Sequence, residues 1–225
     1  MSADPTPGLL LLTGLVLGMR HAFDRDHVAA VTHFISLEPD PLKSAWFGVR
    51  WALGHAVTVL ALGSLILLLH LKFDPAFERY AELMVGFTLV GLGLWRLGLL
   101  WQERRHTHQH AHRTQVHSHP HSHEPGRDHV HRFAPTLVGM VHGAAGTAEV
   151  FVLIPITLIA TTWLAYTYIA LFSAGCALTM GLYGYLAGRF YRRANLTGQQ
   201  LYRGLVVLTS LSGLALGVIW ITRNL

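Results

Sequence analysis

The chain alternates between long apolar runs and short polar connections, the pattern of a protein that crosses a membrane several times. Six apolar segments reach or exceed the roughly 20 residues that a helix needs to span a bilayer. They cover residues 8–36, 45–71, 80–101, 135–160, 163–188 and 202–221. The pattern therefore predicts an all-α integral membrane protein with six transmembrane helices.

Composition agrees with this class. Of the 225 residues, 52% are hydrophobic and only 13% are charged. The net charge of +5 does not indicate nucleic-acid binding, because the basic residues flank apolar runs. The single cysteine, Cys176, excludes an intramolecular disulfide and suggests no cysteine-based metal site. The first eight residues lack a basic stretch, so no cleaved signal peptide is predicted.

The basic residues of the connections predict an orientation. Ten lysines and arginines lie in connections 37–44, 102–132 and 189–203, whereas three lie on the opposite side. Cytoplasmic loops are enriched in such residues, so the first group should face the cytoplasm and both termini the exterior. Arg96, near the cytoplasmic end of the third segment, is expected to snorkel toward the interface.

A dense run of ionisable side chains interrupts the first segment. Charged residues at membrane depth cost about 2.5–3.5 kcal/mol each and are candidates for function. In a continuous helix, about 100° per residue places His21, Asp24 and His27 on one face and Asp26 on another side. Two imidazoles and a carboxylate on one face favour a divalent transition metal. A salt-bridged network with the neighbouring arginines is the alternative.

The same stretch resembles the signature of a known family. His21, Asp26 and His27 fit the H-x4-D-H motif of the nickel/cobalt transporter superfamily, and Asp24 matches a second aspartate common within it. The resemblance implies a multi-pass permease of the prokaryotic cytoplasmic (inner) membrane, with these four side chains as metal ligands. Ni²⁺ or Co²⁺ would be the transported substrate, and no cofactor is implied. Arg25 occupies a place where a small residue is more usual.

The second segment contains a further candidate ligand. Residues 51–59, WALGHAVTV, resemble the second motif of the family, in which L-G-H precedes a small residue and Thr-Val. The resemblance makes His55 a ligand candidate. A histidine hydrogen-bonded across helices is the alternative. Arg50 is a candidate gating or second-shell residue that pairs with an aspartate of the first motif.

The fourth segment carries the third motif. Residues 141–149, VHGAAGTAE, are similar to the H-G-x-A-G-[ST] pattern of the shorter, urease-accessory-type members. Longer members show an aspartate that is missing here. The resemblance implies His142 as a ligand, with Thr147 and Glu149 as gating, proton-linked or second-shell groups. In a continuous helix, Glu149 lies about two turns from His142 on nearly the same face.

A short internal similarity suggests a repeat. Residues 18–22, GMRHA, match residues 139–143, GMVHG, and each opens a group of three segments. The units 1–101 and 133–225 would then form an inverted 3+3 repeat, an arrangement in which the site lies near midplane at the repeat interface. Chance similarity between glycine-rich helices is the alternative.

The connection 102–132 holds ten of the sixteen histidines. Because it has too few apolar residues to build a core, it is predicted to be a disordered cytoplasmic linker that binds metal as an auxiliary site. A pH-responsive polybasic loop is the alternative. These histidines are His106, His108, His110, His112, His117, His119, His121, His123, His129 and His131.

Together these features favour secondary transport of nickel, with cobalt as the second candidate, over enzymatic activity. No Walker motif is present, so ATP hydrolysis is not expected from this chain. Two alternatives remain open: an intramembrane His/Asp metalloenzyme, and a membrane metal sensor or accessory protein that does not transport. The predicted partners are the metal ion and the lipid bilayer, with cytoplasmic metallochaperones as further candidates and no nucleic acid.

Overall fold

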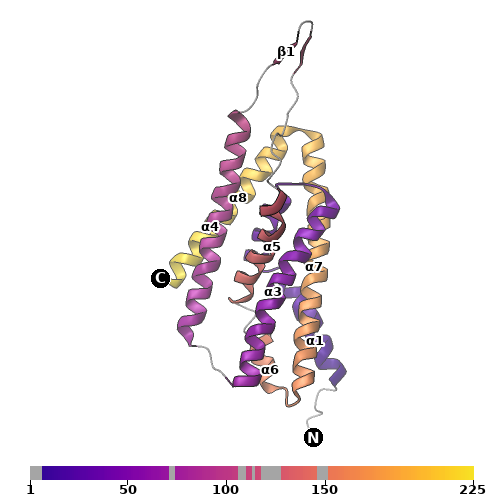
Figure 1. Ribbon diagram of the computed structural model, residues 1–225, viewed down its shortest axis with the longest axis vertical. Helices are drawn as coiled ribbons and strands as arrows, with labels where there is room; N and C mark the ends of the chain where they lie inside the picture. Colours follow the sequence, from indigo (N-terminus) through magenta and orange to yellow (C-terminus); the bar gives the residue numbers. More distant parts are fainter. Residues whose placement is uncertain (1–6, 71–73, 106–109, 113–114, 118–127, 146–151) are drawn as a thin grey trace.

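The computed structural model describes residues 7–70, 74–105, 110–112, 115–117, 128–145 and 152–225. These residues form eight helices and one short hairpin, arranged as an elongated bundle (Figure 1). The hairpin projects from one end of the bundle, and the junction between the last two helices, at Gly198, lies at the same end (Figure 1). The N-terminus lies at the opposite end. We call the first of these the hairpin end. The elements are α1 (Pro7–His21), α2 (Arg25–Ile35), α3 (Pro41–Leu69), α4 (Pro75–Arg105), β1 (His110–His112), β2 (Gln115–His117), α5 (Asp128–Gly143), α6 (Ile154–Leu158), α7 (Thr162–Thr197) and α8 (Gln199–Asn224).

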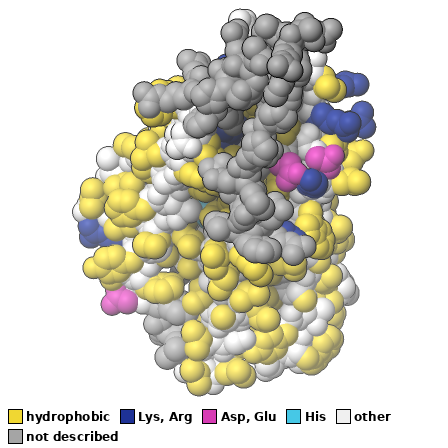
Figure 2. All heavy atoms as spheres, turned by 45° about the horizontal axis from the view of Figure 1, so that its top comes forward, with side chains coloured by type: hydrophobic (Ala, Val, Ile, Leu, Met, Phe, Trp, Pro, Cys, Tyr) yellow, Lys and Arg dark blue, Asp and Glu magenta, His cyan; other side chains and the backbone are white. Residues whose placement is uncertain are grey.

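Four of the described helices are long and apolar enough to cross a membrane: α3, α4, α7 and α8. Their outward faces carry large apolar side chains, as Leu178, Leu182 and Leu186 do along one face of α7. Figure 2 shows hydrophobic side chains over much of the described part of one face of the molecule. Such a surface requires an apolar surrounding. The chain is therefore a helical membrane protein.

The first and fourth predicted segments are not continuous helices. Segment 8–36 is divided into α1 and α2, and segment 135–160 into α5 and α6. Within the first segment, the amides of Phe23 and Asp24 bond to the carbonyls of Arg20 and His21 at 3.0 and 2.9 Å. These tight turns end α1 before α2 begins. The prediction of an unbroken helix was wrong here, because the chain closes a turn in place of the next helical bonds.

Close backbone contact determines how the helices meet. Helix α1 packs against α7, α5 against α3, α3 against α7, and α4 against α8. A Cβ atom on Gly54 of α3 would collide with the carbonyl oxygen of Thr136 in α5. A Cβ atom on Gly139 of α5 would likewise collide with the carbonyl oxygen of Trp51 in α3. Helices α3 and α5 are therefore packed backbone to backbone, as small residues permit in membranes.

The histidine-rich connection contains paired backbone. Strands β1 and β2 are antiparallel, with His110 opposite His117 and His112 opposite Gln115. The hairpin lies within the connection 102–132, whose disorder stays a prediction. Five of the candidate linker histidines lie outside the described residues: His106, His108, His119, His121 and His123.

Arg96 is buried, with 1% of its surface exposed, so the prediction that it snorkels to the interface was wrong. Its guanidinium finds hydrogen-bond partners inside the bundle, on Ser36 and Tyr202. A buried cation that is hydrogen-bonded avoids most of the penalty that would otherwise drive it to the surface.

Candidate metal centre

The break between α1 and α2 places two motif histidines at facing helix ends. His21 is the last residue of α1, and His27 lies in the first turn of α2. The carbonyl oxygen of His21 accepts both the Asp24 amide, at 2.9 Å, and Nδ1–H of His27, at 3.2 Å. The prediction that a continuous helix places these side chains on one face was therefore wrong, because the helix is interrupted between them. The turn and this second bond bring the two rings together instead.

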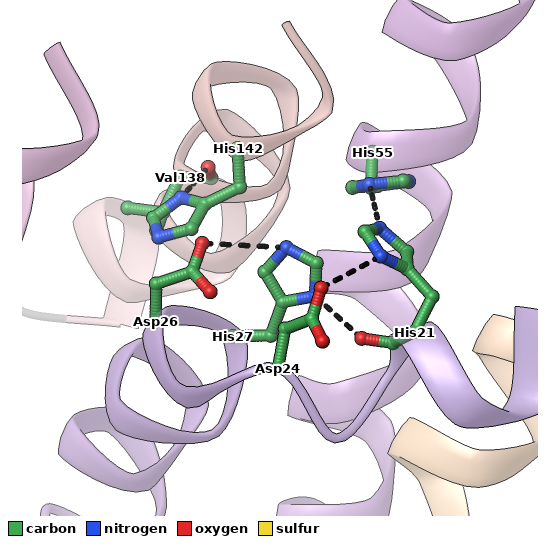
Figure 3. Close-up of polar contacts among 7 residues, drawn as sticks. All are labelled: His21, Asp24, Asp26, His27, His55, Val138 and His142. Carbon is green, nitrogen blue, oxygen red and sulfur yellow. Dashed lines mark hydrogen bonds and ion pairs between the residues drawn. The ribbon is translucent and has the colours of Figure 1, made fainter. Parts of the chain in front are cut away.

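Three buried imidazoles meet at this break (Figure 3). The candidate ligand atoms of His21, His27 and His55 all lie within 4.8 Å of one another. Nε2 of His21 and Nε2 of His55 are 3.1 Å apart. Metal–imidazole bonds are about 2.0–2.1 Å long, so two nitrogens on one ion are separated by roughly 3 Å. The spacing of this pair suits one transition-metal ion.

Asp24 orients the His21 ring. Its Oδ2 lies 2.9 Å from Nδ1 of His21. Because a carboxylate only accepts, Nδ1 is the protonated nitrogen and Nε2 presents its lone pair toward His55. A carboxylate behind a metal-binding histidine typically fixes the tautomer and raises ligand basicity. This geometry favours an orienting role for Asp24 over direct ligation.

Asp26 joins the cluster, against the prediction that it points to another side. Its Oδ2 lies 3.4 Å from Nε2 of His27 (Figure 3). Because Nδ1 of His27 donates to the His21 carbonyl, a neutral ring presents its Nε2 lone pair to the carboxylate. Two lone pairs face each other favourably only when a cation or a proton lies between them. Asp26 and His27 therefore offer one oxygen and one nitrogen to a cation.

His142 approaches the cluster from α5. Its Nδ1 donates to the Val138 carbonyl at 2.8 Å, so Nε2 carries the lone pair. This buried Nε2 has no hydrogen-bond partner within the described part of the chain. The ring centroid lies 5.8 Å from that of His27, beyond the three-histidine group. His142 is placed to extend the set of ligands on the α5 side.

Two aromatic rings enclose the centre. Trp51 stacks with His55 at 5.4 Å between centroids and lies 4.6 Å from the His27 ring. Phe172 of α7 lies 5.2 Å from the His21 ring. Both rings are fully buried, so they exclude water and strengthen electrostatic interactions inside the centre. Sequence reasoning assigned neither ring a role, although Trp51 lies one helical turn before His55.

Three further candidates are Arg50, Thr147 and Glu149. The Arg50 guanidinium lies 5.5 Å from the centroid of the Trp46 ring. Thr147 and Glu149 fall within 146–151, outside the described residues. Helix α5 ends at Gly143, so a continuous helix no longer relates Glu149 to His142.

Fold and centre together define a helical membrane protein with a buried histidine–aspartate cluster sized for a transition-metal ion. The chain is 33% identical over 171 residues to the urease accessory protein UreH of Bacillus sp. (strain TB-90). The match covers 76% of this chain and 72% of that protein. The chain therefore belongs to the urease-accessory UreH family within the nickel/cobalt transporter superfamily, which confirms the resemblance seen in its motifs.

Two further comparisons gave no match. No family model matches the chain, and no solved structure matches it.

Proposed function

We propose that this protein is a secondary permease that carries nickel, with cobalt as a second substrate, across the prokaryotic cytoplasmic membrane. The observation that carries the proposal is the buried group of His21, His27 and His55, in a member of a nickel/cobalt transporter family. Imidazole suits nickel and cobalt, whereas magnesium and calcium prefer all-oxygen sites. The site residues thus account for the class of cation.

The broken helix supplies the means of binding at membrane depth. The C-terminal end of α1 carries a partial negative charge from its unpaired carbonyls, which favours a cation nearby. Discontinuous helices are common at the ion sites of secondary transporters for this reason. As the cation loses water, His21, His27 and His55 replace part of its hydration shell, Asp26 adds an oxygen, and His142 adds a further nitrogen.

An inverted repeat is part of the proposal. The contact of Gly18 with Phe172 joins α1 to α7, and that of Gly139 with Trp51 joins α5 to α3. Gly139 follows Gly18, and Phe172 follows Trp51, by the same number of residues that separates His142 from His21. This exchange of equivalent contacts supports two related halves, 1–101 and 133–225, whose relative movement would alternate access to the centre.

The membrane potential would drive transport inward. It is worth about 2.3 kcal/mol per charge per 100 mV, and roughly twice that for a divalent ion. The basic connections support a cytoplasmic location for the hairpin end. Metal released there would reach the histidine-rich linker, which we propose as an auxiliary store, and then cytoplasmic metallochaperones.

A second candidate follows from the relative, which is a urease accessory protein. In that role the chain would bind nickel at the membrane for urease without carrying it across. The same centre would bind the metal in either function.

Flux through the purified full chain in proteoliposomes separates them. With an inside-negative potential, we expect saturable nickel uptake that rises with the potential, is inhibited by cobalt and is insensitive to magnesium. Empty liposomes and liposomes without a potential are the controls. Tight nickel binding without flux would favour the accessory role and overturn the transport proposal.

Replacing Asp24 by asparagine tests its orienting role. Loss of the carboxylate behind His21 should weaken nickel binding about 10–100-fold, the usual effect of an outer-shell change, and leave some flux. Calorimetry on the purified protein measures the affinity. Asp40→Asn is the matched control, because Asp40 caps α3 away from the centre and asparagine caps helices equally well. A loss as complete as that of His21→Ala would identify Asp24 as a direct ligand.

Replacing residues 106–127 by a glycine–serine linker of equal length should lower the number of nickel ions bound and leave flux intact. A segment of this composition cannot form a packed core, so the bundle does not need it to fold. Equilibrium dialysis gives the stoichiometry, and proteoliposomes give the flux. Loss of flux in a variant that inserts normally would contradict the auxiliary role.

A further inference from the structure

Arg96 joins the end of α2 to two other helices. Its Nε donates to Ser36 Oγ and its Nη2 to the Ser36 carbonyl, both at 3.0 Å. Nη2 also donates to the Tyr202 hydroxyl at 3.3 Å, and that hydroxyl donates to the same Ser36 carbonyl at 2.6 Å. Ser36 is fully buried. These bonds satisfy the Ser36 carbonyl, which the helix end leaves unpaired, and they tie α2 to α4 and α8.

This cluster lies at the opposite end of α2 from the metal centre. Asp26 and His27 are in the first turn of α2, and Ser36 is its C-terminal cap. Ten residues of helix separate Asp26 from Ser36, or about 15 Å at roughly 1.5 Å per residue. Tyr202 lies near the start of α8, at the hairpin end (Figure 1). The Arg96–Ser36–Tyr202 cluster thus stands between the centre and that end.

We propose that Arg96, Ser36 and Tyr202 form a latch that holds α2 closed over the metal centre on the hairpin side. The latch rests on the proposed transport function, which requires the centre to open to one side at a time. Releasing the end of α2 moves a helix that carries two of the cluster side chains and opens the route toward the hairpin end. Arg96 acts through Ser36 and does not touch the cation, so it is a positioning residue.

The bonds are of a kind that can be broken and remade. The latch joins three helices through one serine, and none of its bonds involves α3 or α5. A small group of hydrogen bonds at a helix end suits reversible movement better than continuous apolar packing does. One further polar pair reaches the last turn of α2: the Thr32 and Tyr183 hydroxyls lie 2.5 Å apart and join α2 to α7. Tyr191 donates to Thr209 at 3.1 Å and joins only α7 to α8.

The single cysteine provides a reporter. Cys176 is fully buried and packs in one core group with Val31 of α2 and Trp51 beside the centre. A charged, membrane-impermeant maleimide should label Cys176 slowly in the resting protein. Opening of α2 should expose Cys176 from the hairpin side alone. The Cys176→Ala variant gives the background level of maleimide labelling.

Tyr202→Phe is the principal variant and Tyr191→Phe its matched control. Both remove one hydrogen-bonded hydroxyl from neighbouring rings, whose centroids lie 6.4 Å apart. We expect Tyr202→Phe to raise the labelling rate about tenfold from the hairpin side, the factor that roughly 1.4 kcal/mol represents. Nickel affinity should be unchanged, because Tyr202 does not contact the centre. Tyr191→Phe should label like the parent protein.

Arg96→Gln should have a larger effect than Tyr202→Phe where it folds. Equal labelling of the two Tyr→Phe variants, or equal acceleration from both sides of the membrane, would overturn the latch. So would a lower thermal midpoint of Tyr202→Phe with unchanged labelling, which is the signature of a purely structural bond. Latch-dependent labelling in a protein without nickel flux would retain the latch and overturn the transport proposal. Nickel flux together with unchanged labelling of Tyr202→Phe would overturn the latch and retain the transport proposal.

Discussion

Replacing His27 by alanine is expected to abolish nickel binding at the buried centre, and with it nickel flux. His27 lies in the three-histidine group and also faces Asp26, so its loss removes one nitrogen and leaves the carboxylate without its partner. The cost of dehydrating the cation is then uncompensated. The loss should exceed the roughly 10–100-fold expected of outer-shell changes. Calorimetry and proteoliposome uptake measure the two effects.

His33→Ala is the control for this substitution. His33 is also a buried histidine of α2, and its Nδ1 also donates to a backbone carbonyl, that of Ala29 at 2.6 Å. It lies outside the three-histidine group. The variant should retain nickel binding. Normal binding and uptake in His27→Ala, or equal losses in both variants, would remove the basis for the centre.

The second large effect is expected of Gly54→Ala. The added Cβ would collide with the Thr136 carbonyl oxygen and force α3 away from α5. His55 and His142 sit on these two helices, so nickel binding should be lost along with thermal stability. Overpacking of this kind costs about 1–3 kcal/mol or more. The thermal midpoint in detergent and nickel calorimetry measure the result.

Gly91→Ala is the matched control, because a Cβ at Gly91 meets nothing within 4 Å. Alanine is a better helix former than glycine by about 1 kcal/mol, so this variant should be as stable as the parent or more stable. Equal behaviour of the two variants would show that α3 and α5 do not require the glycine contact.

The long helices were predictable because their signal is local. Runs of apolar residues in α7 and α8 exceed the span of a bilayer, whatever they pack against. The break before Asp24 was not predictable in this way, because residues 22–24 contain neither proline nor glycine. The only local hint is Asp24 itself, a residue type that favours helix starts. The bond from His27 to the His21 carbonyl stabilises the turn, and it exists only in the folded chain.

The members of the candidate site could be listed from motifs, but their arrangement could not. Asp26 reaches the cluster because the helix restarts after the turn, and His55 arrives from α3 through packing that no local pattern encodes. The contacts of Arg96 likewise could not be predicted from the local sequence. Its position near a predicted helix end suggested snorkelling, whereas its partners Ser36 and Tyr202 are distant in sequence.

X-ray absorption at the nickel edge is the most direct test of the central claim, that the buried histidines bind the metal. The protein should carry the glycine–serine replacement of residues 106–127, so that linker histidines in that range do not contribute to the spectrum. With one equivalent of nickel, we expect scattering from about three imidazoles at roughly 2.0–2.1 Å, reduced by one ring in His55→Ala. A spectrum with oxygen ligands alone, or one unchanged by His55→Ala, would contradict the assignment of the centre.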